Sequence, residues 1–222
     1  MLDDDLIYIN EAFHAAKVSH EQFDRLLAEG WRHFGTQFFR YNWAFHDLDI
    51  RSVIPLRIRL ANFSLSKSQR RVLRKNDDLR TELRPANISQ EAEMLFNRHK
   101  GRFKHGVPDS IYDFIARDAE SAPCEMLEMA VYRDEKLIAL SYFDIGGKSC
   151  SGIYAIFEPL ESRRSLGVFT MLKEIEFSME NGKDFYYQGY AYEGESFYDY
   201  KKRFRGTEAF EWSGSWKPCD LG

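Results

Sequence analysis

The sequence predicts an α+β protein with a mixed central sheet flanked by helices. Apolar residues alternate with polar ones at residues 54–60, which is typical of a strand with one buried face. Three strand-like runs separated by short polar turns cover residues 124–157. Helical spacing returns after Pro159, where apolar side chains recur every three or four residues. With 222 residues, 44% of them hydrophobic, the chain is long enough for one large domain or two small ones.

A short helix is expected near the beginning of the chain. Ser19 and Gln22 form a capping-box pattern, and Gly30 is a typical stop signal. The aromatic and basic run at residues 34–40 is then expected to form a strand.

The run at residues 54–60 is expected to bury its leucine and isoleucine side chains, which occupy every second position. Arg57 and Arg59 fall on the opposite side of this strand. Both guanidinium groups are therefore expected to point at water or at a ligand.

A strongly basic stretch, SKSQRRVLRK, covers residues 66–75 of a chain whose net charge is −4. Ser66 and Gln69 form a second capping-box pattern, so a helix is expected to begin at Lys67. A solvated surface is the general explanation for such a charge run. However, like charges at i, i+4 repel each other, and an anionic partner would remove this repulsion. The cations share one helical face and are Lys67, Arg70, Arg71, Arg74 and Lys75.

The remaining elements follow from the same signals, and a soft boundary near residue 85 separates two parts. Residues 1–85 hold the basic helix and residues 86–222 hold the strand meander, although one continuous unit is equally compatible with the sequence. In the helix at residues 90–103, Met94, Leu95 and His99 are expected to form the apolar stripe. The other expected elements are a strand at 79–84, a helix at 111–115, strands at 124–133, 137–145 and 150–157, a helix beginning near 165, and a strand at 185–190.

The composition argues against several classes of protein. No apolar run approaches the ~20 residues that span a bilayer, and the acidic start MLDDDLIYIN differs from the basic start of an export signal. Three widely spaced cysteines argue against a disulfide framework and a cysteine zinc site. The six histidines show no metal-binding spacing. We therefore expect a cytoplasmic protein that needs no membrane and has no metal site.

The sequence RSLG at residues 164–167 joins the last meander strand to a helix. Such a turn presents backbone N–H groups and the helix dipole to an anion, and Gly167 lets a phosphate approach the backbone. It resembles the acyl-CoA-binding turn of the GNAT acyltransferases, although Phe169 replaces the second small residue of that pattern. The resemblance implies a GNAT-like fold. A helix simply capped by Ser165 is the structural alternative.

The segment at residues 186–204 interleaves aromatic and basic side chains. Rings beside cations suit stacking on unpaired bases while the cations hold phosphates. The same rings also suit packing in a core.

Four stretches of the chain together resemble the aminoacyl-tRNA–protein transferases, the arginyl- and bacterial leucyltransferases of the N-end rule pathway. They are GWRHFGTQFFR, IPLRI with FSLSKSQRRVLRKNDDL, SGIYAIFEPLESRRSLGVFTMLKEI and YYQGYAYEGESFYDYKKRF. The resemblance implies transfer of an amino acid, arginine favoured over leucine, from charged tRNA to the α-amino group of a protein or peptide that begins with Asp or Glu. The implied tRNA contacts are Lys67, Ser68, Gln69, Arg70, Arg71, Arg74, Arg163, Arg164, Ser165 and Gly167.

The chain departs from the family between FFR and IPLRI. There the family carries cysteines of a metal or iron–sulfur region, whereas this chain has YNWAFHDLDIRSV. No metal site carries over, and no cofactor is expected besides aminoacyl-tRNA as the co-substrate.

The implied chemistry begins from an ester that is already activated. The site must accept a proton from the acceptor amine, stabilise an oxyanion and hold both substrates together. The catalytic candidates are Tyr154, Tyr190 and Lys201, of which Lys201 is also a candidate for holding the tRNA 3′ end or an acidic acceptor. The sequence does not identify the base, and Glu193 and Asp144 are guesses only.

Three alternatives remain open at this point. An acyl-CoA-dependent GNAT N-acyltransferase would use the RSLG turn and leave the basic helix without a task. A non-catalytic RNA-binding relative would bind tRNA without transfer. Aminoacyl transfer to a specialised peptide or small molecule is the third.

Overall fold

The computed structural model describes residues 8–46, 49–103 and 106–219. The acidic start of the chain, up to residue 7, and His105 lie outside these ranges. The helices are α1 (His20–Ala28), α2 (Lys67–Lys75), α3 (Gln90–Lys100), α4 (Leu166–Glu180) and α5 (Asp199–Lys202), with 3-10 turns η1 (Leu60–Asn62), η2 (Ile111–Asp113) and η3 (Pro159–Arg164). The strands are β1 (Asn10–His14), β2 (Arg32–Phe34), β3 (Gln37–Tyr41), β4 (Trp43–His46), β5 (Asp49–Arg59), β6 (Arg80–Pro85), β7 (Glu125–Arg133), β8 (Lys136–Ile145), β9 (Ser149–Phe157), β10 (Phe185–Tyr192), β11 (Thr207–Glu211) and β12 (Ser215–Pro218).

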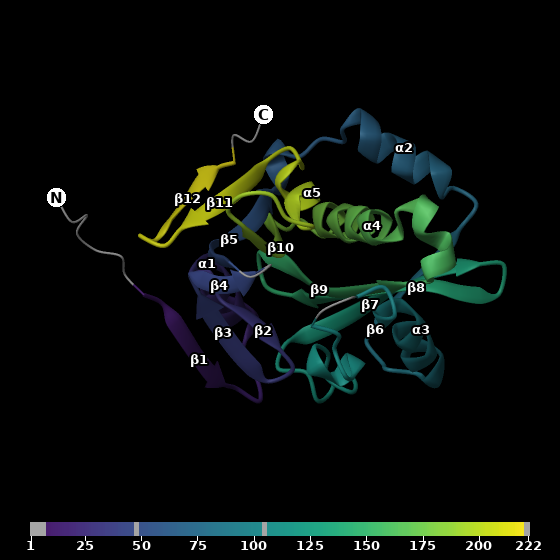
Figure 1. Ribbon diagram of the computed structural model, residues 1–222, viewed down its shortest axis with the longest axis horizontal. Helices are drawn as coiled ribbons and strands as arrows, with labels where there is room; N and C mark the ends of the chain where they lie inside the picture. Colours follow the sequence, from purple (N-terminus) through teal and green to yellow (C-terminus); the bar gives the residue numbers. More distant parts are fainter. Residues whose placement is uncertain (1–7, 47–48, 104–105, 220–222) are drawn as a thin grey trace.

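A large mixed sheet forms the centre of the molecule, as the predicted α+β class requires. Its strands run in the order β12-β11-β5-β10-β9-β8-β7-β6, and β4 pairs with β5 beside this path (Figure 1). The neighbours are antiparallel except β9 and β10, which are parallel. A second sheet, β1-β3-β2, lies with α1 at one end of the large sheet (Figure 1). Helix α4 covers one face of the large sheet, α3 covers the other, and α2 packs on α4 (Figure 1).

Both predicted capping boxes are present. The Ser19 hydroxyl accepts from the Gln22 amide at the start of α1, and Ser66 accepts from Gln69 at the start of α2. The reciprocal side-chain bonds to the cap residues are present as well. The predicted meander is also confirmed, because β7, β8 and β9 pair antiparallel in sequence order. Local signals were sufficient for these elements.

The single strand predicted at residues 34–40 is wrong. The structure has a hairpin of β2 and β3 in which Phe34 pairs with Gln37. The chain reverses at Gly35, whose φ of +50° is in the region that favours glycine. Aromatic residues, which are common in strands, lie on both sides of this turn, so the sequence suggested one continuous strand.

The prediction that Arg57 points at water or a ligand is also wrong. Arg57 is only 7% exposed, and its Nε donates to Glu208 Oε2 at 2.7 Å. Its guanidinium lies 3.9 Å from the centre of the Phe185 ring and 4.3 Å from that of Trp216. The β11–β12 hairpin, which the sequence did not predict, extends the sheet beside β5 and supplies both Glu208 and Trp216. Arg59 shares Glu208 and remains partly exposed.

Smaller differences concern the ends of helices. Helix α3 ends at Lys100, before Gly101, and not at residue 103. Its buried face includes Leu95 and His99 as predicted, whereas Met94 is exposed. The helix predicted at 111–115 is the three-residue η2. Strands β1, β4, β11 and β12 and helix α5 were not predicted.

The large sheet takes strands from both sides of the boundary suggested near residue 85. Strand β5 lies between β10 and β11 and pairs with both. No helix in the described ranges is long and apolar enough to cross a membrane.

Candidate functional site

The candidate site lies where β9 and β10 separate. Their parallel pairing covers only three residue pairs, from Phe185↔Ser149 to Tyr187↔Ser151. Beyond this point β9 continues beside β8 and β10 continues beside β5. Irregularities accompany the separation, because both outer pairings shift register there and Gly189 has a φ of +88°. The two strands therefore diverge, and side chains from other elements enter the opening between them.

Arg32 enters this opening from β2. Its NH1 group donates to Ser151 Oγ and its NH2 group to Gly152 O. The side chain is buried, and the described residues place no carboxylate within ion-pair distance of it. Burial lowers the pKa of Arg32 from its ordinary value, and a guanidinium remains protonated in proteins. A buried cation without a paired anion is costly and is typical of a site that binds an anionic ligand.

Lys201 brings a second nitrogen to the same place from α5. Its Nζ donates to Tyr190 O at 3.2 Å and lies 4.9 Å from the centre of the Tyr198 ring. Burial, followed by the charge of Arg32, lowers the pKa of Lys201 to about 7. The amine is therefore partly neutral at neutral pH and can accept a proton.

Gly189 marks the point where these two groups meet. A Cβ atom at this position would lie 3.5 Å from both Arg32 NH2 and Lys201 Nζ. The positive φ of the residue disfavours any side chain there in addition. Glycine therefore keeps the space beside both groups free.

Glu174 and Tyr186 close the opening on the α4 side. The buried Tyr186 hydroxyl donates to Glu174 Oε2, and burial raises the pKa of Glu174 to about 7. A Cβ at Gly152 would lie 2.5 Å from the Tyr186 hydroxyl oxygen. Glycine at position 152 is therefore required for this contact, and it brings the pair beside the carbonyl that Arg32 holds.

Of the three predicted catalytic residues, the structure places the Lys201 side chain in the opening. The Tyr190 hydroxyl donates to Gly30 O at 2.7 Å, so this group ties β10 to the N-terminal part of the chain. The Tyr154 ring stacks on Phe114 with the centroids 4.2 Å apart. Its hydroxyl is buried and forms no hydrogen bond with the residues that the structure describes.

The basic face of α2 is intact in the structure. Its five cations are exposed, and none forms an ion pair with a described residue. Lys75 Nζ donates to the backbone carbonyl of Arg163, which joins the exposed Arg163 to this surface. Gln69 differs from the other predicted contacts because it is buried and its side-chain oxygen accepts from the Ser66 backbone N–H in the helix cap. Ser68 is exposed and shares a hydrogen bond with the Ser66 hydroxyl.

The RSLG turn is less suited to hold a phosphate than its sequence suggested. Arg164 donates to both oxygens of Asp78 and to Glu161, and these contacts raise its pKa. Ser165 has a φ of 56° and its side chain forms no capping bond, so the alternative of a simple serine cap is wrong. A Cβ at Gly167 would meet Phe157 only at ordinary contact distance, so packing does not require glycine there.

Sequence reasoning missed Arg32, Glu174 and Tyr186 as site residues. A signal for Glu174 was present, because its spacing from Leu166 and Thr170 places it on the buried face of α4. No local signal separated Arg32 from the other arginines of its segment.

Comparisons with known proteins identify the family of this chain. Residues 91–211 match the family model described as arginine-tRNA-protein transferase, C terminus. An aspartate/glutamate leucyltransferase of Marinobacter nauticus is 31% identical over 91% of this chain and 84% of its own length. One of Hahella chejuensis is 29% identical over 92% and 86%.

The crystal structure of FemX matches with a TM-score of 0.53 and 10% identity, covering 90% of this chain and 69% of that one, which shows a shared fold. The sequence matches place the chain among the aminoacyltransferases, as predicted. It belongs to the arginine-tRNA-protein transferase family.

Proposed function

We propose that this protein transfers leucine from charged tRNA to the α-amino group of proteins that begin with Asp or Glu. The convergence of Arg32 and Lys201 between β9 and β10 carries the proposal, because it joins a fixed positive charge to a proton acceptor. The names of the relatives support leucine and give no support to the arginine favoured by the sequence. Because charged tRNA is the co-substrate, we place the reaction in the cytoplasm and assign it no further cofactor.

Lys201 acts as the proton acceptor in this proposal. Its neutral amine takes a proton from the acceptor α-ammonium, whose ordinary pKa of about 8 is close to that of the lysine. The free amine attacks the ester carbonyl carbon, and Lys201 returns its proton to the tRNA ribose oxygen as the ester C–O bond breaks. The neutral lysine then takes the second proton from the nitrogen of the new amide and releases it to water. The products are the extended protein and uncharged tRNA.

Arg32 selects the acceptor. Ser151 and Gly152 use two of its N–H groups, and a guanidinium has five, so further donors remain for a carboxylate. An N-terminal Asp or Glu would supply that carboxylate, whereas Asn or Gln would leave the buried charge unpaired.

The donor tRNA lies along the basic face of α2 and Arg163. Exposed cations without acidic partners suit a phosphate backbone. We also propose that the fold is GNAT-like, supported by the β7–β8–β9 meander, the parallel opening of β9 and β10, and α4 between them. In this arrangement the ester end of the tRNA enters the opening.

A transfer assay read by mass spectrometry tests the function. Peptides that begin with Asp, Glu, Asn or Gln are offered with leucyl-tRNA or arginyl-tRNA, and we expect one added leucine on the Asp and Glu peptides only. Arg32→Gln should raise KM for these peptides and reduce the preference for Asp over Asn, whereas Arg59→Gln should change neither. If acetyl-CoA gave product and neither charged tRNA did, the acyl-CoA-dependent alternative would be established. If tRNA bound and no product formed, the protein would be a non-catalytic relative.

A further inference from the structure

Three side chains with metal-binding atoms lie together in the interior, from parts of the chain that are far apart in sequence. They are His33 on β2, Cys124 just before β7 and Asp144 on β8, and all three are buried. Their donor atoms lie within 4.8 Å of one another. The group is outside the interval in which the chain lacks the family's cysteines, so it is a separate feature.

The hydrogen bonds of His33 define what its second nitrogen can do. Nδ1 lies 2.9 Å from Gly35 O, and a carbonyl oxygen only accepts, so Nδ1 carries a proton. In the neutral ring, Nε2 then carries a lone pair and no proton. It faces Asp144 Oδ2 at 2.6 Å and Cys124 Sγ at 3.9 Å, which are both electron-rich. A lone pair 2.6 Å from a carboxylate oxygen requires a proton or another cation between the two atoms.

A histidine of this kind matches the usual geometry of a metal ligand. Metal-binding histidines typically donate their other N–H to a backbone carbonyl or a carboxylate, which fixes the ring for coordination. The His33 ring is held further by Phe38, with the ring centres 4.8 Å apart, and by Phe23 at 5.8 Å. Two aromatic rings therefore pack against the imidazole.

Asp144 supplies an independent observation. Its Oδ1 atom is buried and accepts no hydrogen bond from any residue in the described ranges. A buried carboxylate oxygen without a donor is costly, whereas a metal ion would stabilise the whole carboxylate.

We propose that His33, Cys124 and Asp144 bind one zinc-type divalent cation. A thiolate, a carboxylate and a neutral imidazole are all accepted ligands of Zn²⁺, and the two negative charges balance the ion in the buried site. A water molecule completes the tetrahedron. Ligand atoms around Zn²⁺ are about 3.3–3.7 Å apart, given its bond lengths of about 2.0–2.3 Å. Binding therefore requires His33 and Asp144 to separate and Cys124 to approach.

The position of the site gives the ion a structural task. His33 is the neighbour of Arg32 on β2, and Asp144 pairs with Ser151, to which Arg32 donates. The ion would fasten the small sheet to β8 and thereby hold Arg32 in the opening between β9 and β10. His33, Cys124 and Asp144 are positioning residues in this scheme.

The metal content of the purified full-length protein tests the proposal. We expect about one zinc per chain after dialysis without chelator, and a thiolate-to-metal charge-transfer band when Co²⁺ replaces zinc. Cys124→Ser should lose the zinc and the band. Cys150→Ser is the matched control, because Cys150 is equally a buried free thiol but lies outside the group, and it should keep both.

A second measurement covers the case in which Cys124→Ser does not fold. The wild-type protein is alkylated with and without a chelator, and the modified cysteines are identified by peptide mass spectrometry. Chelation should increase modification of Cys124 and leave Cys150 unchanged. Protein that takes up neither zinc nor Co²⁺ would overturn the proposal and leave a protonated His33–Asp144 pair. Zinc retained by folded Cys124→Ser would overturn the assignment of the ligands.

Discussion

Lys201 illustrates how the surroundings of a single residue define its chemistry. In water a lysine side chain is charged at neutral pH, but burial and the nearby Arg32 both disfavour that charge. The pKa of about 7 makes Lys201 useful for proton transfer, and the same burial of the amine lowers the free energy of unfolding.

Replacing Lys201 by Met should therefore lower kcat and raise stability. The loss of a proton acceptor is expected to reduce kcat by a factor of about 10²–10⁴. The unfolded lysine binds its proton near its ordinary pKa of 10.5, whereas the folded one does so only near 7. Wild-type stability therefore falls as the pH falls from 10.5 to 7, and the methionine variant lacks this loss. Its gain in Tm should be larger at pH 6 than at pH 9.

Thermal unfolding at both pH values, together with a pH profile of kcat, checks this expectation. Wild-type kcat should rise with pH through about 7, because the neutral amine is the active form. Lys202→Met is the neighbouring control. It removes an amine that donates to the Tyr192 and Gly194 carbonyls and pairs with Asp199, so it should destabilise the protein. A gain in Tm that is independent of pH would contradict the proposed state of Lys201.

Helix α2 is the element whose form and task were both predicted from sequence. Its cap, its start at Lys67 and its basic face depend only on residues within one short stretch, and the structure has all three. Val72 and Leu73 attach the helix to the core, which leaves the cations exposed.

Charge reversal on this face should weaken tRNA binding and its dependence on salt. Replacement of Arg70, Arg71 and Arg74 by Glu removes three candidate phosphate contacts. The slope of log K against log salt should decrease by about one for each lost contact. Filter binding or fluorescence anisotropy over a range of salt concentrations measures both quantities.

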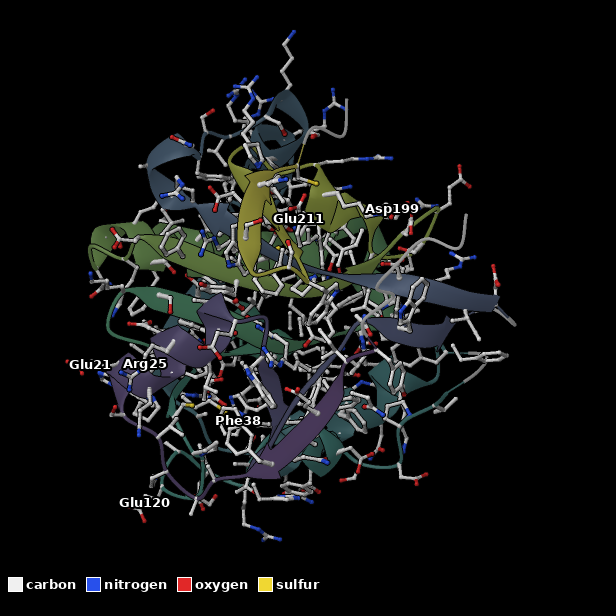
Figure 2. The ribbon with its side chains drawn as sticks, turned by 90° about the vertical axis from the view of Figure 1, so that its left-hand side faces the viewer. Glu21, Arg25, Phe38, Glu120, Asp199 and Glu211 are labelled. Carbon is white, nitrogen blue, oxygen red and sulfur yellow. The ribbon has the colours of Figure 1, made fainter. Side chains whose placement is uncertain are left out.

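A control variant with the same change of charge separates a local effect from a general one. Arg25→Glu, Lys148→Glu and Lys217→Glu alter exposed cations away from α2, and Figure 2 shows Arg25 on α1, far from the helix at the top of the view. This variant should retain most of the binding. Equal losses in both variants would show that only net charge matters.

Other elements could not be predicted because distant parts of the chain define their surroundings. Arg57 has the sequence pattern of an exposed residue, but β11 pairs with β5 and brings Glu208 to it, and Trp216 of β12 lies against its guanidinium. The hairpin of β2 and β3 was hidden because one glycine between aromatic residues is a weak turn signal.

At the scale of the whole molecule, β5 connects the two parts that the sequence suggested. It pairs with β10 on one side and with β11 on the other. Without β5 both strands would become open edges, and Glu208 would lose Arg57.

A fragment of residues 86–222 is therefore expected not to fold by itself. Circular dichroism and the dispersion of amide resonances should show an unfolded chain, whereas the full protein should unfold in one cooperative transition. A chain shortened by residues 1–7 removes no described element and serves as the control. A folded fragment would instead establish the boundary near residue 85.

The sequence by itself determined the local features: the α+β class, both capping boxes, the meander, the basic face of α2 and the family resemblance. Each depends on residues a few positions apart, for which periodicity and capping chemistry are sufficient. Only the tertiary structure decided that Arg32, Lys201 and Glu174 meet where β9 and β10 separate, and that His33, Cys124 and Asp144 form one buried group. These groups come from elements far apart in the chain, and their charge states depend on burial, which no local pattern encodes.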